Sequence, residues 1–414
     1  MSTQEQNTLF ASQMISALVT LGCKHFAICP GSRSTPLTIA VARNPNAESY
    51  VFHDERSAAF FVLGLGKSEQ LGAIITTSGT AIANAFPAVM EASNTHLPML
   101  VISADRPPEL RGSGANQTMD QVELFGKAVR FFFDFPCPST SFSAKAFAST
   151  LSYAVSKCFG SNAGPVHLNC MFREPLEPLS MVEMVFPKPA LYSYPKQVLS
   201  FESQKQLLAD CQEATNPILV IGELESKADQ NAALRLAKSL DWPVFVDISS
   251  GIALQNIQNK VPFIEIVLEQ HHVIPTPDLI LQLGRGFTTK KYENWTRTIS
   301  VKHIIIDSRD SRYDPGHSCS WRLQADLSYL EFLEDLRSPN ISWIRKLQIQ
   351  LHNISIPKQT VSEIAIAHQL PSWLPKDSHL FIGNSMPIRD CNNYSLLAEN
   401  IVLACNRGVS GIDG

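Results

Sequence analysis

Short apolar strands alternate with helices through the first 180 residues, and this alternation limits the possible folds more than any other feature of the chain. Segments with the character of buried strands lie at 25–29, 49–52, 73–77, 99–103, 131–135 and 165–170. Helical patterns separate them, for example at 81–93 and 144–159. Strands joined through helices form parallel sheets that helices cover on both faces. We therefore expect residues 1–180 to form a doubly wound α/β domain.

Four of these strands end in polar loops. The loops lie at 29–36, 52–57, 76–80 and 104–110. Because the carboxyl ends of parallel strands meet at one edge of the sheet, loops at these ends form the ligand site of an open α/β sheet. The sequence therefore predicts a binding site built from these four loops.

One carboxylate in these loops is fixed at the start of a helix. Apolar residues recur at helical spacing from Ala58 to Leu65, which predicts a helix over 54–67 with Asp54 as its N-cap. Glu55 then lies in the first turn, where the helix dipole alone favours a carboxylate. Its place among four polar loops instead favours a catalytic role for Glu55.

A proline-rich segment separates this pattern from a second one. Five prolines lie between positions 175 and 195, which predicts a linker rather than regular structure. Helices and strands alternate again from about 200, with strands predicted at 218–223, 244–248, 279–283 and 303–307. We expect a middle α/β domain over 198–345.

A second predicted linker, 353–360, precedes a third region. A helix over 361–370 and strands at 380–383 and 401–405 predict the start of another α/β domain over 358–414. Its roughly 55 residues are few for such a unit. We therefore expect the chain to be truncated at its carboxyl end.

Composition excludes several classes of protein. Of the 414 residues, 44% are hydrophobic and 17% charged, as expected for packed cores. A net charge of -4 without a long basic run argues against nucleic acid as a partner. We find no signal-peptide pattern and no apolar stretch long enough to span a bilayer, so we expect a cytoplasmic protein without stable membrane insertion. The nine cysteines include no Cys-x-x-Cys pair and indicate free thiols.

Several short motifs occur together and in order. They are Pro30-Gly31-Ser32-Arg33, Asp54-Glu55-Arg56, Asp105-Arg106-Pro107-Pro108, Gly114-Ala115-Asn116-Gln117 and Asn406-Arg407-Gly408. This set resembles the thiamine-diphosphate-dependent synthases of the menaquinone pathway, which make 2-succinyl-5-enolpyruvyl-6-hydroxy-3-cyclohexene-1-carboxylate. The resemblance is specific at about 25–135 and 380–414 and architectural between them.

The resemblance implies a reaction. The enzyme would use thiamine diphosphate with Mg²⁺ or Mn²⁺ to decarboxylate 2-oxoglutarate and add the succinyl carbanion equivalent to isochorismate, in menaquinone or phylloquinone biosynthesis. Glu55 would bond the aminopyrimidine ring and promote loss of the thiazolium proton. The resemblance places the magnesium ligands beyond Gly414, so residues 1–414 alone would be inactive. It also implies a homodimer or a dimer of dimers.

The resemblance further implies the residues of the site. Those at the cofactor would be Glu55, Gly79, Thr80, Ser385 and Ile412. Those at the substrates would be Ser32, Arg33, Arg106, Asn116, Gln117, Lys290, Asn384, Arg389 and Arg407. The substrates carry several carboxylates, which suit the planar fork of arginine. Arg33, Arg106, Arg389 and Arg407 are each expected in a loop directly after a strand or in the following turn. A single arginine in a loop is usually a solvated surface charge, but four near strand ends indicate anion binding.

Two other interpretations stay open. Another thiamine-dependent enzyme, such as a 2-oxoacid decarboxylase or an acetolactate-synthase-like relative, would share Glu55 but need fewer arginines. A non-catalytic truncated protein would bind carboxylates or partners without a cofactor. Titration with thiamine diphosphate separates the non-catalytic protein from both thiamine-dependent enzymes. Product analysis with isochorismate separates the menaquinone-pathway synthase from the other thiamine-dependent enzyme.

Overall fold

The computed structural model describes residues 1–412 apart from 181–185, 225, 270–275, 337–361 and 399–400. The chain forms two compact units, one of Met1–Pro195 with Gly408–Gly414 and one of Lys196–Arg407. We call them unit 1 and unit 2. The predicted linker 353–360 lies outside the described residues, and the three predicted domain ranges stay predictions. No helix in the described ranges is long and apolar enough to cross a membrane.

Unit 1 is built on a six-stranded parallel sheet with the order β2-β1-β3-β4-β6-β5. Its strands are β1 (His25–Ile28), β2 (Glu48–Val51), β3 (Gly72–Thr76), β4 (Met99–Asp105), β5 (Phe131–Phe135) and β6 (Pro165–Met171). All six predicted strands are confirmed, with small shifts at their ends. The loops that follow β1, β2 and β4 carry the motifs of Arg33, Glu55 and Arg106.

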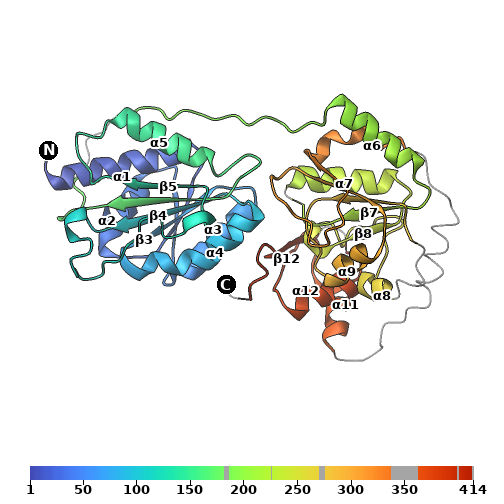
Figure 1. Cartoon of the computed structure of the whole chain (residues 1–414). Coiled ribbons are helices and arrows are strands. Elements are labelled where there is room, and N and C mark those ends of the chain that lie inside the picture. The colour runs from blue at the N-terminus through green and yellow to red at the C-terminus, as the bar shows by residue number, and fades with distance from the viewer. Residues whose placement is uncertain (181–185, 225, 270–275, 337–361, 399–400, 413–414) are drawn as a thin grey trace. The chain divides into compact units, whose positions relative to one another are not determined.

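Helices cover both faces of this sheet (Figure 1). They are α1 (Thr3–Thr20), α2 (Thr35–Arg43), α3 (Glu55–Lys67), α4 (Phe86–Thr95) and α5 (Ala144–Ser156). Apolar residues of α1, α2 and α5 share one core layer, and those of α3 and α4 share the other. The doubly wound α/β fold predicted for this region is confirmed.

The helix predicted over 81–93 begins later than expected. Residues Gly79–Ala85 form a 3₁₀ segment, and α4 begins only at Phe86. Pro87 lacks a backbone N–H and cannot donate the α-helical bond to position 83, so it fits only the first turn of a helix. The 3₁₀ segment brings Asn84 to the start of α3, as described below.

Unit 2 contains a five-stranded parallel sheet with the order β11-β10-β9-β7-β8. The strands are β7 (Pro217–Ile221), β8 (Val244–Val246), β9 (Leu279–Leu283), β10 (Lys302–Asp307) and β11 (Trp321–Gln324). The helices are α6 (Phe201–Glu213), α7 (Lys227–Ser239), α8 (Ile264–Glu269) and α9 (Lys290–Thr298). The predicted second α/β pattern is confirmed, and β11, α8 and α9 were not predicted.

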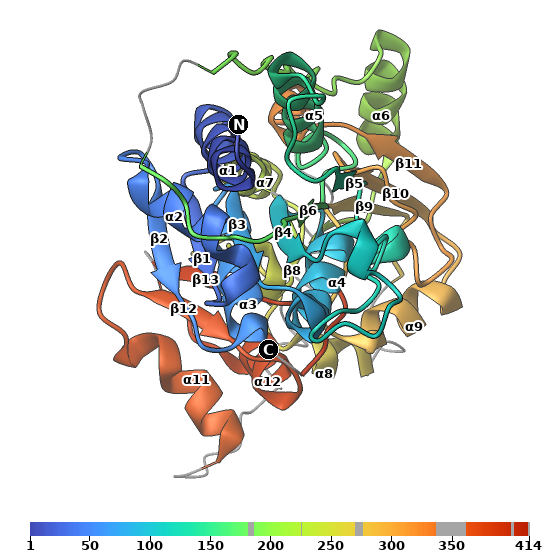
Figure 2. The same cartoon turned by 90° about the vertical axis from the view of Figure 1, so that its left-hand side faces the viewer.

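A second, two-stranded parallel sheet completes unit 2. Strands β12 (His379–Ile382) and β13 (Val402–Cys405) lie side by side with helices α11 (Glu363–Trp373) and α12 (Met386–Tyr394) next to them (Figure 2). Buried residues of this sheet and of α12 join the same core cluster as β7 and β9. The segment that carries Asn384, Arg389 and Arg407 is therefore packed onto the five-stranded sheet of unit 2.

Candidate active site

Glu55 is the first residue of α3, at the carboxyl end of β2. Asp54 caps this helix, because its Oδ1 accepts the Ser57 N–H at 2.8 Å, as predicted. The Glu55 side chain is half-buried, and its Oε2 lies 3.4 Å from Asn84 Nδ2. Burial, followed by the nearby Glu55 and Asp54 carboxylates, raises the pKa of the Cys29 thiol to about 12. The carboxyl ends of β1 and β2 and the 3₁₀ segment after β3 therefore lie close to the Glu55 carboxylate.

The turn after β3 has backbone geometry that requires glycine. Gly79 has φ +84°, and a Cβ at this position would meet Gln117 Cγ at 3.1 Å. Ser78 Oγ donates to the Gln117 carbonyl at 3.2 Å, and Gln117 Nε2 donates to the Ser78 carbonyl at 3.1 Å. Gln117 therefore lies against the Gly79 turn, and it is exposed like the neighbouring Thr80 and Asn116.

Arg33 and Arg106 converge on one carboxylate in unit 1. Arg33 is 2% exposed, and it donates to the Phe172 carbonyl at 2.8 Å and to Glu174 Oε1 at 2.9 Å. Arg106 Nη1 lies 3.9 Å from the same Glu174 oxygen. The Nε atoms of both arginines are buried without a hydrogen-bond partner. Two cations with unused donors around one anion position form a site suited to a further carboxylate.

Asn384 and Arg407 lie together in unit 2. Asn384 Nδ2 donates to the Asn406 carbonyl at 2.7 Å, and Arg407 Nη1 lies 3.4 Å from Asn384 Oδ1. Arg407 Nη2 also approaches the Thr288 carbonyl at 3.4 Å. Lys290 follows two residues later as the first residue of α9 and is exposed. Three of the predicted substrate residues therefore come from neighbouring segments of this unit.

Asp247 fixes the segment before Lys290, and sequence reasoning did not single it out. It is fully buried, and its carboxylate accepts the Thr288 N–H at 2.6 Å and the Thr288 hydroxyl at 2.8 Å. Burial is the main cause that raises the pKa of Asp247. The sequence signal was an aspartate near the end of the predicted strand 244–248, a position that is also common in structural turns.

The remaining predicted residues have fewer contacts. Arg389 lies on helix α12, not in a loop or turn as expected, and its exposed Nη1 is 3.9 Å from Met386 Sδ. Ser385 precedes this helix with φ +73° and is exposed. Ser32 is exposed in a 3₁₀ segment, and Ile412 is 79% exposed. Ser32 and Ile412 belong to unit 1, and Ser385 and Arg389 belong to unit 2.

A buried glutamate holds the chain end that carries Ile412. Glu91 on α4 is 2% exposed, and its two carboxylate oxygens accept the N–H groups of Gly408 and Val409, each at 2.8 Å. A carboxylate bonded by two successive backbone N–H groups is a strong charge-assisted contact. Residues from Gly408 onward accordingly belong to unit 1.

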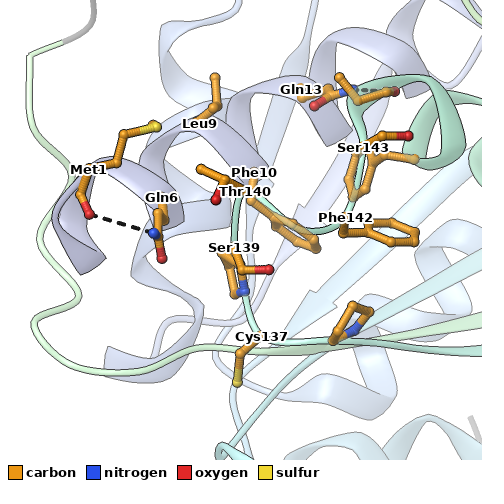
Figure 3. Close-up of a pocket in the computed structure, with 14 residues that line it drawn as sticks. Met1, Gln6, Leu9, Phe10, Gln13, Cys137, Ser139, Thr140, Phe142 and Ser143 are labelled. Carbon is orange, nitrogen blue, oxygen red and sulfur yellow. Dashed lines mark hydrogen bonds between the residues drawn. The ribbon is translucent and has the colours of Figure 1, made fainter.

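A cavity of about 230 Å³ lies elsewhere in unit 1, between α1 and the segment after β5. Figure 3 shows Phe10 and Phe142 together with Cys137 and Gln13 along its walls. None of the predicted site residues lines this cavity. Among the residues that the structure describes, no group of three or more His, Cys, Asp or Glu side chains is arranged to hold a metal ion.

Two protein-family models match the chain. Residues 9–124 match the thiamine pyrophosphate enzyme N-terminal TPP binding domain, and residues 191–382 match the middle domain of thiamine pyrophosphate enzymes. The first match contains the loops of Arg33, Glu55, Gly79 and Arg106, and the second contains Lys290.

Individual relatives match over the whole chain. A protein of Chlorobium phaeobacteroides (strain BS1), named 2-succinyl-5-enolpyruvyl-6-hydroxy-3-cyclohexene-1-carboxylate synthase, is 38% identical over 443 positions that cover 100% of this chain and 75% of the relative. A protein of the same name from Prosthecochloris aestuarii is 37% identical with the same coverage. Protein PHYLLO, chloroplastic, of Arabidopsis thaliana is 34% identical over 99% of this chain and 27% of its own length.

Proposed function

Because the chain belongs to the family of 2-succinyl-5-enolpyruvyl-6-hydroxy-3-cyclohexene-1-carboxylate synthases, we propose that it makes this product with thiamine diphosphate as cofactor. The enzyme decarboxylates 2-oxoglutarate and joins the resulting succinyl group to isochorismate. The observation that carries the proposal is the pair formed by Arg33 and Arg106, whose unused Nε donors lie in the same set of strand-end loops as Glu55.

Three residues of unit 1 are suited to hold the cofactor. Thiamine diphosphate supplies, when bound, the carbanion chemistry of this reaction. Glu55 offers a half-buried carboxylate, held at a helix start, that can share a proton with a ring nitrogen. Gly79 presents backbone without a side chain, and Thr80 follows it with an exposed hydroxyl. We assign Ser385 and Ile412 to the same cofactor, following the family motif.

The arginines are suited to hold carboxylates that persist through the reaction. One carboxylate of 2-oxoglutarate leaves as carbon dioxide, but the succinyl carboxylate and those of isochorismate remain. Permanent anions are bound best by cations that stay charged, as arginine does. We assign Arg33, Arg106, Arg389, Arg407 and Lys290 to these anions. Ser32, Asn116, Gln117 and Asn384 are assigned to the polar groups of the substrates.

The remaining parts of the proposal concern the ion, the assembly and the compartment. A divalent cation, Mg²⁺ or Mn²⁺, would bind the diphosphate through oxygen ligands. We propose a homodimer or a dimer of dimers in which the three ranges 1–180, 198–345 and 358–414 act as domains. Nine free cysteines suit a reducing compartment, which supports a cytoplasmic location.

Product analysis tests the proposed reaction. Full-length enzyme is incubated with thiamine diphosphate, Mg²⁺, 2-oxoglutarate and isochorismate, and the products are followed by mass spectrometry together with carbon dioxide release. We expect the named product only when both substrates are present. Release of carbon dioxide with formation of succinic semialdehyde alone would favour the 2-oxoacid decarboxylase. Carboligation of pyruvate would favour the acetolactate-synthase-like enzyme.

A further inference from the structure

A buried amide in unit 1 connects the Gly79 turn to the strand before Arg106. Gln121 is fully buried, and its Oε1 accepts the Gly79 N–H at 2.9 Å. Its Nε2 donates to the Ala104 carbonyl at 3.2 Å and to Asn169 Oδ1 at 3.0 Å. One side chain therefore bonds the turn after β3, the end of β4 and the middle of β6.

Asn169 continues this connection to the Arg106 loop. It is fully buried on β6, and its Nδ2 donates to Asp105 Oδ2 at 2.9 Å and to Asp134 Oδ1 at 2.8 Å. The other oxygen of Asp105 accepts the Arg106 backbone N–H at 2.7 Å. An unbroken hydrogen-bonded path thus runs from Gly79 through Gln121, Asn169 and Asp105 to Arg106.

The directions of these hydrogen bonds are determined by the groups involved. Gln121 and Asn169 each use both N–H donors, and Asn169 Oδ1 also accepts the Ser103 hydroxyl at 2.7 Å. With its proton given to Asn169, Ser103 accepts from His167 Nε2 at 2.8 Å. Reversing the Gln121 amide would place its NH₂ group against the Gly79 N–H. A satisfied buried network of this kind holds one arrangement of its members.

We propose that Gln121 and Asn169 are positioning residues that couple the Gly79 turn to Arg106, so that binding of the cofactor and binding of the 2-oxo acid strengthen each other. This inference rests on the proposed function, which assigns Gly79 to the cofactor and Arg106 to the substrate. Contacts of the cofactor with the turn further stabilise this one arrangement of the path and, with it, the position of Arg106. Coupling between two binding sites is reciprocal. Neither Gln121 nor Asn169 needs to touch a ligand for this effect.

The first test measures the path in the protein without cofactor. Gln121→Met keeps the length of the side chain but removes the acceptor of the Gly79 N–H. We expect amide hydrogen exchange at Gly79 to become at least tenfold faster than in the parent. Gln282→Met is the matched control, because Gln282 is an equally enclosed amide of unit 2 that bonds Tyr292 and His303. It should leave exchange at Gly79 unchanged, and unchanged exchange in Gln121→Met would overturn the proposal.

The second test measures the coupling itself. The dissociation constant of thiamine diphosphate with Mg²⁺ is determined by calorimetry with and without a phosphonate analogue of 2-oxoglutarate that cannot be decarboxylated. We expect the analogue to tighten cofactor binding at least fivefold in the parent and in Gln282→Met, a ratio typical of coupled sites. In Gln121→Met the ratio should fall close to one.

A milder variant keeps the test decisive if Gln121→Met does not fold. Gln121→Asn retains the amide, but it is one methylene too short to bond Gly79 and Asn169 at once, so it should also lower the ratio. An unchanged ratio in a folded Gln121 variant that makes product overturns the coupling while leaving the proposed function intact. A parent enzyme that makes no product from 2-oxoglutarate and isochorismate would instead overturn the proposed function.

Discussion

The arginines assigned to the site are held differently in the two units. In unit 1, Arg33 is 2% exposed and its guanidinium donates at 2.8 and 2.9 Å to Phe172 and Glu174. In unit 2, Arg389 is exposed on a helix, and Arg407 has its named contacts at 3.4 Å. Arg33 is therefore arranged before any substrate arrives. Arg389 keeps more freedom and must lose it on binding.

This difference separates two consequences of losing an arginine. A buried arginine contributes to folding and to substrate binding together, because its removal also leaves a protein acceptor unpaired. An exposed arginine contributes to binding with little effect on folding. Substitutions in the two units should therefore divide into two classes when stability and kinetics are measured on the same variants.

The largest effect is expected for Arg33→Ala. Loss of a charge-assisted contact to a substrate carboxylate should raise the Michaelis constant for 2-oxoglutarate or for isochorismate by roughly ten- to a hundredfold. Loss of the bond to the Phe172 carbonyl should lower the free energy of unfolding by about 1–3 kcal/mol. Steady-state kinetics and urea unfolding measure the two effects. Arg43→Ala, which removes an exposed arginine of the same unit, is the control and should change neither by as much.

A buried histidine in each unit extends the comparison to pH. Burial lowers the pKa of His167 to about 3 and that of His303 to about 4, against 6.5 for an exposed histidine. Below pH 6.5 the unfolded chain binds protons that the folded chain does not, so stability falls with falling pH. Each histidine contributes a slope of up to about 1.4 kcal/mol per pH unit, down to its own folded pKa.

The test replaces each histidine in turn. His167→Gln should flatten the dependence of unfolding free energy on pH between 6.5 and about 3, and His303→Gln should flatten it only down to about 4. Urea unfolding at a series of pH values gives these slopes, which are compared independently of the absolute stability of each variant. Slopes equal to that of the parent would show that these histidines take up protons in the folded protein as readily as in the unfolded chain.

Arg389→Ala should have a smaller and purely kinetic effect. Its guanidinium is exposed, so we expect the free energy of unfolding to stay within about 0.5 kcal/mol of the parent. The Michaelis constant for 2-oxoglutarate or for isochorismate should rise by about tenfold, since one charge-assisted contact to a substrate is lost. Stability loss as large as in Arg33→Ala would remove the distinction between the units.

The smallest effect is expected for Glu174→Gln. Glu174 is 72% exposed, and its carboxylate lies against both Arg33 and Arg106. Removing its charge takes away a competitor for the substrate carboxylate, so we expect a Michaelis constant to fall by a few-fold, in line with a solvent-screened pair. A rise in both Michaelis constants would mean that Glu174 orients the arginines rather than competing with substrate.

Much of unit 1 could be predicted because the sequence patterns that define its elements involve only nearby residues. The Asp54 cap, the strands and the polar loops each depend on residues a few positions apart. The 3₁₀ segment over Gly79–Ala85 was missed, although Pro87 was a visible signal for a late helix start. Arg389 was placed in a loop or turn, because the helix α12 is short and carries four polar residues in nine.

The buried network could not be predicted from the sequence. Gln121 lies 48 positions from Asn169, and only the parallel pairing of β4 with β6 brings Asn169 beside Ser103. Asp247 likewise bonds Thr288, 41 positions away. Polar residues in apolar strands are visible in the sequence, but their partners depend on sheet order and register, which local patterns leave open.

The role of Glu55 is tested by hydrogen exchange at the thiazolium carbon of bound thiamine diphosphate. The full-length enzyme, Glu55→Gln and Asp54→Asn are loaded with cofactor, mixed with D₂O, quenched rapidly and analysed by NMR. We expect accelerated exchange in the parent and in Asp54→Asn, since asparagine also caps helices. In Glu55→Gln the acceleration should be lost although the cofactor stays bound. Exchange as fast in Glu55→Gln as in the parent would contradict the role assigned to Glu55.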